Sequence, residues 1–120
     1  MPPHRIFLIE NSSDALIVIP QGDVSSLEES TVQSELRAIL ALLPQATTTH
    51  LVVDLARAPF FGSTMLGSLI KLWHHVDASG GKMALCNASD FVVDVLNATK
   101  LDTVWPVFKS RPEAEAALSA

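Results

Sequence analysis

The sequence predicts an α/β protein built on a five-stranded, mixed but mostly parallel sheet, and two observations carry that prediction. Short apolar runs alternate with segments whose apolar residues recur at helical spacing, in the order β-β-α-β-α-β-α-β-α. Only the first two runs follow one another without a helix between them, so they predict a hairpin and an antiparallel edge. Crossovers through helices make the other strands parallel. All of residues 1–120 is interpreted as a single domain with about four helices.

The expected strands are short apolar runs bounded by turn-forming residues. They lie at residues 5–10, 15–20, 50–55, 82–86 and 103–108. The second run contains the letters ALIVI without interruption, which indicates a strand covered on both faces. Pro106 interrupts the last run and removes a backbone donor, which predicts an edge position or a bend.

Each expected helix has a start signal in the sequence. Capping-box patterns, in which a serine is followed three residues later by glutamate, precede the first and last helices at Ser25 and Ser110. The second helix is expected to begin near Ser63 and to stop at the small residues 79–81. Ser89 can cap the third helix through its hydroxyl.

Composition and charge exclude several classes of protein. Apolar residues make up 48% of the chain and charged residues 18%, which disfavours disorder. The net charge is −5 and the eight basic residues are scattered, which argues against nucleic-acid binding. No apolar run approaches the roughly 18 residues of a membrane span, and the N-terminus lacks the apolar core of a signal peptide. With its lone cysteine, the chain is expected to be cytoplasmic, without direct membrane insertion.

The usual signatures of cofactor, metal and thiol chemistry are missing from the sequence. Neither Gly-rich phosphate-binding fingerprint occurs, so no nucleotide cofactor is expected. His74 and His75 are adjacent on a predicted helix and point in different directions, while His4 and His50 are isolated in sequence. No metal site is therefore expected. Cys86 lies within an apolar strand, where an inert core thiol is favoured over a nucleophile.

Asp54 is the candidate carboxylate for a catalytic or ligand-binding role. It lies near the end of the third strand, and ligands of α/β proteins gather at the carboxyl ends of strands. The favoured interpretation is structural, with the carboxylate accepting backbone N–H groups from the following corner. No acid, base or nucleophile adjacent in sequence completes a catalytic set, and a small hydrolase would need a deep polar pocket around Asp54. The chain is therefore not expected to be an enzyme.

The junction between the third strand and the second helix, residues 51–73, is the most informative segment. Ser63 or Thr64 places a hydroxyl at a helix N-terminus, where three roles are considered: helix cap, anion site or phosphorylation switch. Without a Gly-rich loop or a basic cluster, a permanent anion site is disfavoured. The aromatic residues Phe60 and Phe61 precede the hydroxyl. A phosphate would add about −1.5 to −2 charges beside them and disfavour an apolar or acidic partner.

The same segments carry a family resemblance that covers nearly the whole chain. They are Gly22-Asp23-Val24, VVDLARAPFFGSTMLG and GGKMALCNASDFVVDVLNATKLDTVWPVF. With them the chain resembles the STAS domain, the module shared by bacterial anti-sigma factor antagonists and the cytoplasmic tails of sulphate transporters. Family members show Asp-Leu, a few residues, and then an apolar-x-Asp-Ser-[Ser/Thr]-Gly-Leu-Gly junction. The matching residues here are Asp54, Leu55, Ser63, Thr64, Leu66 and Gly67.

The resemblance implies a regulatory cycle for this chain. Ser63, with Thr64 as the second choice, would be phosphorylated by a partner anti-sigma factor that is also a serine kinase. A serine phosphatase would remove the phosphate, and the unmodified form would sequester the anti-sigma factor. The predicted partner-binding residues are Ser25, Phe60, Phe61, Gly62, Ser63, Thr64 and Met65.

Three positions depart from the family pattern. Gly62 and Ser25 replace aspartates, and Met65 replaces the glycine after the hydroxyl pair. The two missing carboxylates predict altered kinase recognition, and the substitutions indicate a more apolar surface, although at least one of Phe60 and Met65 is expected in the core. These departures favour an alternative, in which the chain is a docking subunit of a transporter or signalling assembly that is not phosphorylated.

Overall fold

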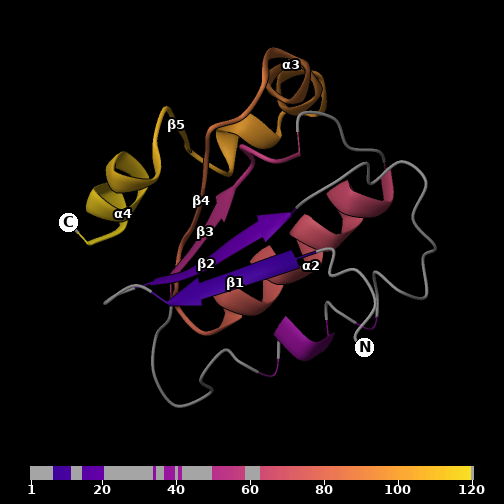
Figure 1. Cartoon of the computed structure of the whole chain (residues 1–120). Coiled ribbons are helices and arrows are strands. Elements are labelled where there is room, and N and C mark those ends of the chain that lie inside the picture. The colour runs from indigo at the N-terminus through magenta and orange to yellow at the C-terminus, as the bar shows by residue number, and fades with distance from the viewer. Residues whose placement is uncertain are drawn as a thin grey trace, which may run out of the picture.

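The structure is a computed structural model that describes residues 7–11, 15–20, 34, 37–39, 41, 50–58 and 63–119 (Figure 1). Five strands form one sheet in the order β1-β2-β3-β4-β5. Their bounds are β1 Phe7–Asn11, β2 Ala15–Pro20, β3 His50–Asp54, β4 Met83–Cys86 and β5 Val107–Phe108. β1 pairs antiparallel to β2, and every other neighbouring pair is parallel. The mixed, mostly parallel sheet that the sequence predicts is thereby confirmed.

The helices also lie where the sequence places them. Their bounds are α2 Ser63–Ala78, α3 Asp90–Thr99 and α4 Arg111–Ser119, with a 3-10 turn, η2, at Leu101–Thr103. Residues 34, 37–39 and 41 are helical and fall inside the first predicted helix, whose expected cap at Ser25 lies outside the described residues. No helix in the described ranges has the length and apolar character needed to cross a bilayer.

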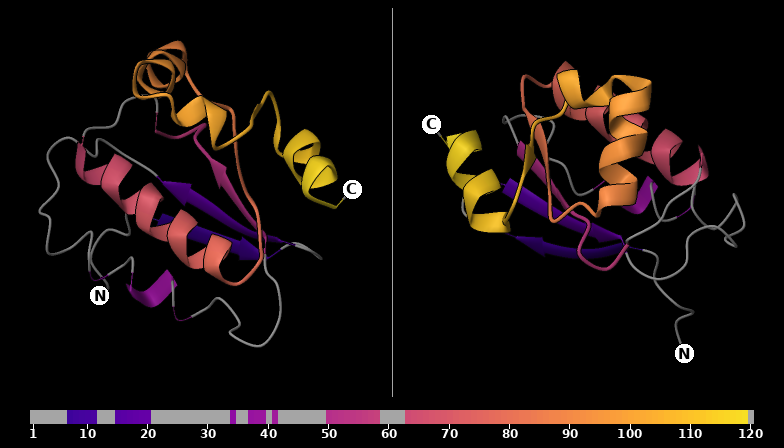
Figure 2. Two further views of the ribbon diagram at one scale, coloured as in Figure 1. Left: turned by 180° about the vertical axis from the view of Figure 1, so that it is seen from behind. Right: turned by 90° about the horizontal axis from the view of Figure 1, so that it is seen from above.

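The sheet separates two apolar layers, because alternate strand residues point to opposite faces. α2 and α3 cover one face, and α4 covers the other (Figure 2). The larger core includes Leu51, Val53, Leu69, Leu72, Val92 and Leu96. The smaller core under α4 includes Ile17, Val52, Ala84, Cys86, Ala114 and Leu118. β2, β3 and β4 are therefore buried on both sides, as their unbroken apolar runs predict.

Two predicted helix caps are present. The Ser89 hydroxyl accepts a hydrogen bond from the Val92 N–H at 3.2 Å and caps α3. The Ser110 hydroxyl accepts from the Glu113 N–H at 3.3 Å, as a capping box requires. The Glu113 carboxylate accepts from the Lys109 N–H at 3.3 Å, one residue earlier than the usual reciprocal bond. The sequence therefore located both helix starts correctly.

The last strand is shorter than predicted. The run 103–108 was expected to be a strand, but only Val107–Phe108 pair with β4. η2 ends at Thr103, and the Trp105 N–H bonds to the Leu101 carbonyl at 2.9 Å, which keeps this part of the chain curled. Trp105 is fully buried, 6.4 Å from Trp73 between ring centroids. Burial of this large ring draws the chain away from β4 until Pro106, which accounts for the two-residue strand.

Candidate functional site

The β3–α2 junction is held by buried residues on the β3 side. The corner after Asp54 turns through a hydrogen bond from the Ala58 N–H to the Leu55 carbonyl at 3.1 Å, and both residues are buried. α2 then begins at Ser63, so the predicted hydroxyl residue is the first of the helix. The side chains of Ser63 and Thr64 are outside the described part of the structure. The predicted site residues Ser25, Phe60, Phe61 and Gly62 also lie outside the described residues.

Met65 and Gly67, in the first turns of α2, differ in how they pack against the rest of the chain. Met65 is 1% exposed and joins the larger core. This agrees with the expectation that Phe60 or Met65 fills the core, and it removes the Met65 side chain from the predicted docking surface. Gly67 is half-buried, and a Cβ added to it would meet no described atom within 4 Å. Packing of the described residues therefore does not require a glycine at position 67.

Asp54 forms the polar centre of this end of the sheet. Its Oδ1 accepts hydrogen bonds from the Ala56 N–H and from the Asn87 side-chain amide, both at 3.0 Å. Its Oδ2 accepts from an Arg111 guanidinium nitrogen at 3.2 Å. The other guanidinium nitrogen of Arg111 pairs with Glu10 at 2.7 Å. The carboxylate thus connects the corner before α2 to β4, to α4 and, through Arg111, to β1.

The environment of Asp54 favours its charged form. Burial is the largest single effect and raises the pKa of Asp54, but the bonds from Asn87, Ala56 and Arg111 together outweigh it and lower the pKa. Glu10 in turn is the main cause that raises the pKa of Arg111. Both Asp54 oxygens are engaged by donors from the chain itself. The structural role that the sequence favoured for Asp54 is confirmed at its bond to the Ala56 N–H.

The contacts of Asn87 and Arg111 with Asp54 were not predicted from the sequence, although the position of Asn87 directly after a strand was a usable signal. Asp54 and Cys86 are paired in register, so Asn87 follows β4 at the same edge of the sheet where Asp54 ends β3. Asn87 has φ 57°, a left-handed conformation that asparagine adopts more readily than most residues. Arg111 is 57 residues from Asp54 along the chain, and no local pattern announces their contact.

The Cys86 thiol is buried, as the sequence predicts, and His50 takes a structural role. Cys86 is fully buried; burial, together with the charge of Asp54, raises its pKa to about 12, as expected for an inert thiol. His50 Nδ1 accepts the Lys82 N–H at 3.0 Å and joins the starts of β3 and β4. The exposed His74 ring lies 4.8 Å from the Trp73 ring. Within the described ranges, no three acidic, histidine or cysteine side chains gather as a metal site.

Comparisons with known proteins bear on the family and on the fold of the chain. The family model of the STAS domain matches residues 7–114. An anti-sigma-factor antagonist (STAS) domain protein from Planctomyces limnophilus is 26% identical, with 95% of this chain and 98% of that chain covered and a TM-score of 0.79. A putative anti-sigma factor antagonist from Thermotoga maritima is 19% identical, with 95% of each chain covered and a TM-score of 0.81.

The anti-sigma factor antagonist SpoIIAA in its unphosphorylated form gives a further structural match. It is 19% identical, with 94% of this chain and 96% of that chain covered and a TM-score of 0.76. At 19% identity, the Thermotoga and SpoIIAA matches support the fold alone. A search of curated proteins found no match.

Proposed function

The chain belongs to the STAS domain family, and we propose that it is a regulatory binding module of the anti-sigma factor antagonist type. The observation that carries this proposal is the position of Ser63, the first residue of α2 after the β3 corner. Two further facts support it. The family match spans this junction, and the 26% identical relative is itself described as an anti-sigma-factor antagonist.

Phosphorylation at this position would act through charge. The first N–H groups of a helix lack intrahelical partners, and the helix dipole favours negative charge there, so a phosphate on Ser63 is compatible with the fold. The first turn of α2 contains no acidic residue that would repel the phosphate. The added charge of about −1.5 to −2 would weaken contact with an apolar or acidic partner surface. The proposed partners are an anti-sigma factor with serine-kinase activity and a serine phosphatase.

Gly67 supports a docking surface on the exposed side of α2. A glycine inside a helix costs about 1 kcal/mol relative to alanine. The described residues leave open space where its side chain would be, so packing among them gives no reason for that cost. A partner whose backbone approaches α2 closely at Gly67 does give a reason. The proposed surface therefore includes Ser63 and Gly67, which are four residues apart and so lie on the same side of α2, without the buried Met65 side chain.

The test uses the full chain and a candidate anti-sigma factor kinase encoded beside its gene. After incubation with ATP, mass spectrometry should locate phosphate at Ser63, and Ser63→Ala should abolish it, whereas Thr64→Ala should not. Ser63→Asp should weaken binding to the kinase, while Ser79→Asp, which adds the same charge at the far end of α2, should not. If the kinase binds the chain but phosphorylates neither Ser63 nor Thr64, the phosphorylation switch is contradicted. The proposal of a binding module would still stand.

Gly67→Ala separates folding from binding. This variant should raise the free energy of unfolding by about 0.5–1 kcal/mol, because alanine is the better helix former. It should also weaken binding of the unphosphorylated chain to its partner, which calorimetry measures. Unchanged binding in a stabilised Gly67→Ala variant would place the partner elsewhere on the molecule.

A docking subunit of a transporter or signalling assembly is the second candidate. Gly62 and Ser25 stand where the family has aspartates, which favours a module that binds without being phosphorylated. Copurification of the tagged full chain distinguishes the two. Recovery of a transporter ATPase, without a kinase and without phosphate on Ser63, would support this second function.

A further inference from the structure

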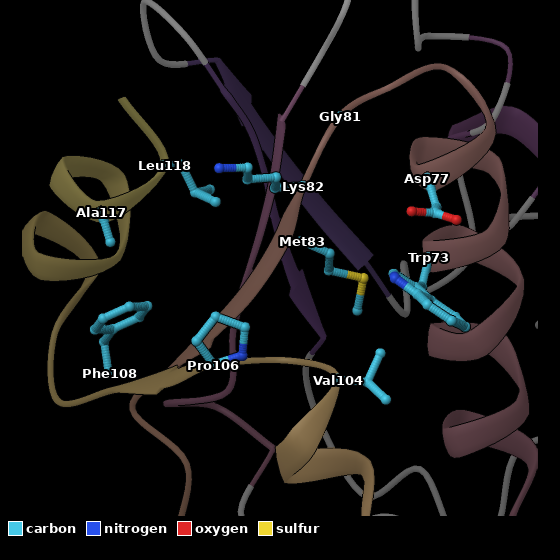
Figure 3. Close-up of a pocket in the computed structure, with 10 residues that line it drawn as sticks. All are labelled: Trp73, Asp77, Gly81, Lys82, Met83, Val104, Pro106, Phe108, Ala117 and Leu118. Carbon is cyan, nitrogen blue, oxygen red and sulfur yellow. The ribbon is translucent and has the colours of Figure 1, made fainter. Parts of the chain in front are cut away.

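A groove opens at the edge of the sheet between α2 and α4 (Figure 3). Its volume is about 380 Å³, within the range of ligand-binding pockets. The large apolar lining residues are Trp73, Met83, Val104, Pro106, Phe108 and Leu118. Asp77 on α2 and Lys82 at the start of β4 supply one charge of each sign.

The groove exists because β5 is too short to cover β4. The Leu85 N–H bonds to the Pro106 carbonyl at 2.9 Å, and the Asn87 N–H bonds to the Phe108 carbonyl at 3.2 Å. Since backbone groups alternate sides along a strand, the N–H and C=O of Met83 point to the same side as those of Leu85. Pro106 has no N–H for the Met83 carbonyl.

The Met83 backbone is therefore an open strand edge inside the groove. Val104 lies in the right-handed helical region at the end of η2, so the chain has already turned away where a longer β5 would accept the Met83 N–H. The ladder of the described strands gives neither Met83 backbone group a partner. Met83 as a whole is only 3% exposed, and buried backbone groups in proteins are nearly always paired.

We propose that this groove binds an extended peptide segment of a partner protein, which pairs with Met83 and adds a short strand beside β4. A strand supplies both a donor and an acceptor to an open edge, which is the basis of strand addition in peptide recognition. A purely apolar small molecule would leave the Met83 N–H and C=O without hydrogen bonds. The backbone chemistry of the groove therefore favours a ligand that supplies both a donor and an acceptor, as a peptide backbone does.

The two walls of the groove define the side chains of that peptide. Alternate side chains of a strand point to opposite faces, so one set meets α2 and η2 and the other meets α4. On the α2 side, Trp73 and Val104 take an apolar side chain, and Asp77 takes a basic one (Figure 3). On the α4 side, Phe108 and Leu118 take an apolar side chain. Lys82, whose side chain extends toward Leu118, takes an acidic one (Figure 3).

The test uses two capped peptides with this pattern, acetyl-Thr-Val-Leu-Lys-Glu-Thr-amide and the same residues in reverse order, because an added strand can pair with β4 in the parallel or the antiparallel direction. Titration into the full-length chain, followed by calorimetry and amide NMR, should show saturable binding of one of them with the largest shifts at Met83. Methylation of the peptide backbone nitrogens should weaken binding by about tenfold or more, since it removes the donors that pair with β4.

Variants of the chain complete the experiment. Val104→Asp should weaken binding by about tenfold or more, because it places a charge on the apolar wall. Val107→Asp is the matched control, since Val107 is exposed to a similar degree, 36% against 39%, and does not line the groove. Circular dichroism and thermal unfolding establish that both variants are folded.

Three outcomes would overturn the proposal. They are failure of both peptides to saturate, equal binding of the backbone-methylated peptide, and equal loss of binding in Val104→Asp and Val107→Asp. Ser63→Asp should leave peptide binding unchanged, so the result is independent of the phosphorylation switch.

Discussion

Arg111 at the start of α4 donates to the Asp54 carboxylate at the end of β3 at 3.2 Å, and so joins two elements that lie 57 residues apart in the sequence. The Asp54 side chain is only 9% exposed, whereas the side chain of Glu10, the other carboxylate that Arg111 contacts, is 53% exposed. The same guanidinium therefore serves one buried and one solvated carboxylate. Asp54 also accepts the Ala56 N–H, so α4 is coupled to the corner that leads toward Ser63.

Removing Arg111 should destabilise the fold by leaving the buried Asp54 charge without its cation. We expect Arg111→Met to lower the free energy of unfolding by about 1–2 kcal/mol. This is less than the cost of breaking a fully buried ion pair, because Arg111 is partly solvated. Urea denaturation followed by circular dichroism measures it. Lys109→Met, which removes an exposed cation two residues earlier, should change stability by less than about 0.5 kcal/mol.

Glu10→Gln provides the contrast on the other side of Arg111. This change should cost less than about 1 kcal/mol, because the Glu10 carboxylate is exposed and its pairing is screened by solvent. A cost for Glu10→Gln as large as that of Arg111→Met would show that the exposed pair, and not Asp54, anchors α4.

The lowered pKa of Asp54 predicts how stability depends on pH. A carboxylate whose pKa is lower in the folded than in the unfolded chain stabilises the fold above the unfolded value, near 3.9. This stabilisation is lost as the pH falls through the lower, folded value. Asp54→Asn should therefore be less stable than the wild type at pH 7, and the difference should shrink below about pH 4. Denaturant midpoints measured from pH 7 to pH 3 test this. A constant difference over that range would contradict a role for the Asp54 charge.

The sequence predicted those features that local patterns encode. Ser89 was identified as a cap from its position before a run of apolar residues at helical spacing, and the structure shows its bond to Val92. The structural role of Asp54 was predicted because its partner, Ala56, is two residues away. Arg111 and Asn87 were missed because their contacts with Asp54 depend on the packing of α4 and on the strand register. The length of β5 was wrong because the burial of Trp105 overrides the strand propensity of its neighbours.

The Cys86 thiol should be unreactive in the folded chain. Its pKa is raised to about 12, mainly by burial and then by the charge of Asp54, so almost no thiolate is present near neutral pH. An aromatic disulfide reagent at pH 8 should react with the native chain far more slowly than with the urea-unfolded chain. Comparable rates would require Cys86 to be exposed. The described residues bury Cys86 beneath α4. Loss of the Arg111–Asp54 contact should let α4 open more often, so Arg111→Met should speed the reaction.

Lys100 offers a stabilising substitution that leaves both proposed sites unchanged. It ends α3 in a left-handed conformation, φ 61° and ψ 19°, and its N–H bonds to the Asn97 and Leu96 carbonyls. This conformation costs a residue with a Cβ roughly 1–2 kcal/mol, and glycine avoids that cost. Part of the gain is offset because glycine loses more backbone entropy on folding, so Lys100→Gly should stabilise the chain by about 0.5–1 kcal/mol. Thermal unfolding measures the change. Lys109→Gly, at an exposed lysine whose φ is not positive, should give no such gain, and a loss of stability in Lys100→Gly would show that the lysine side chain itself supports the end of α3.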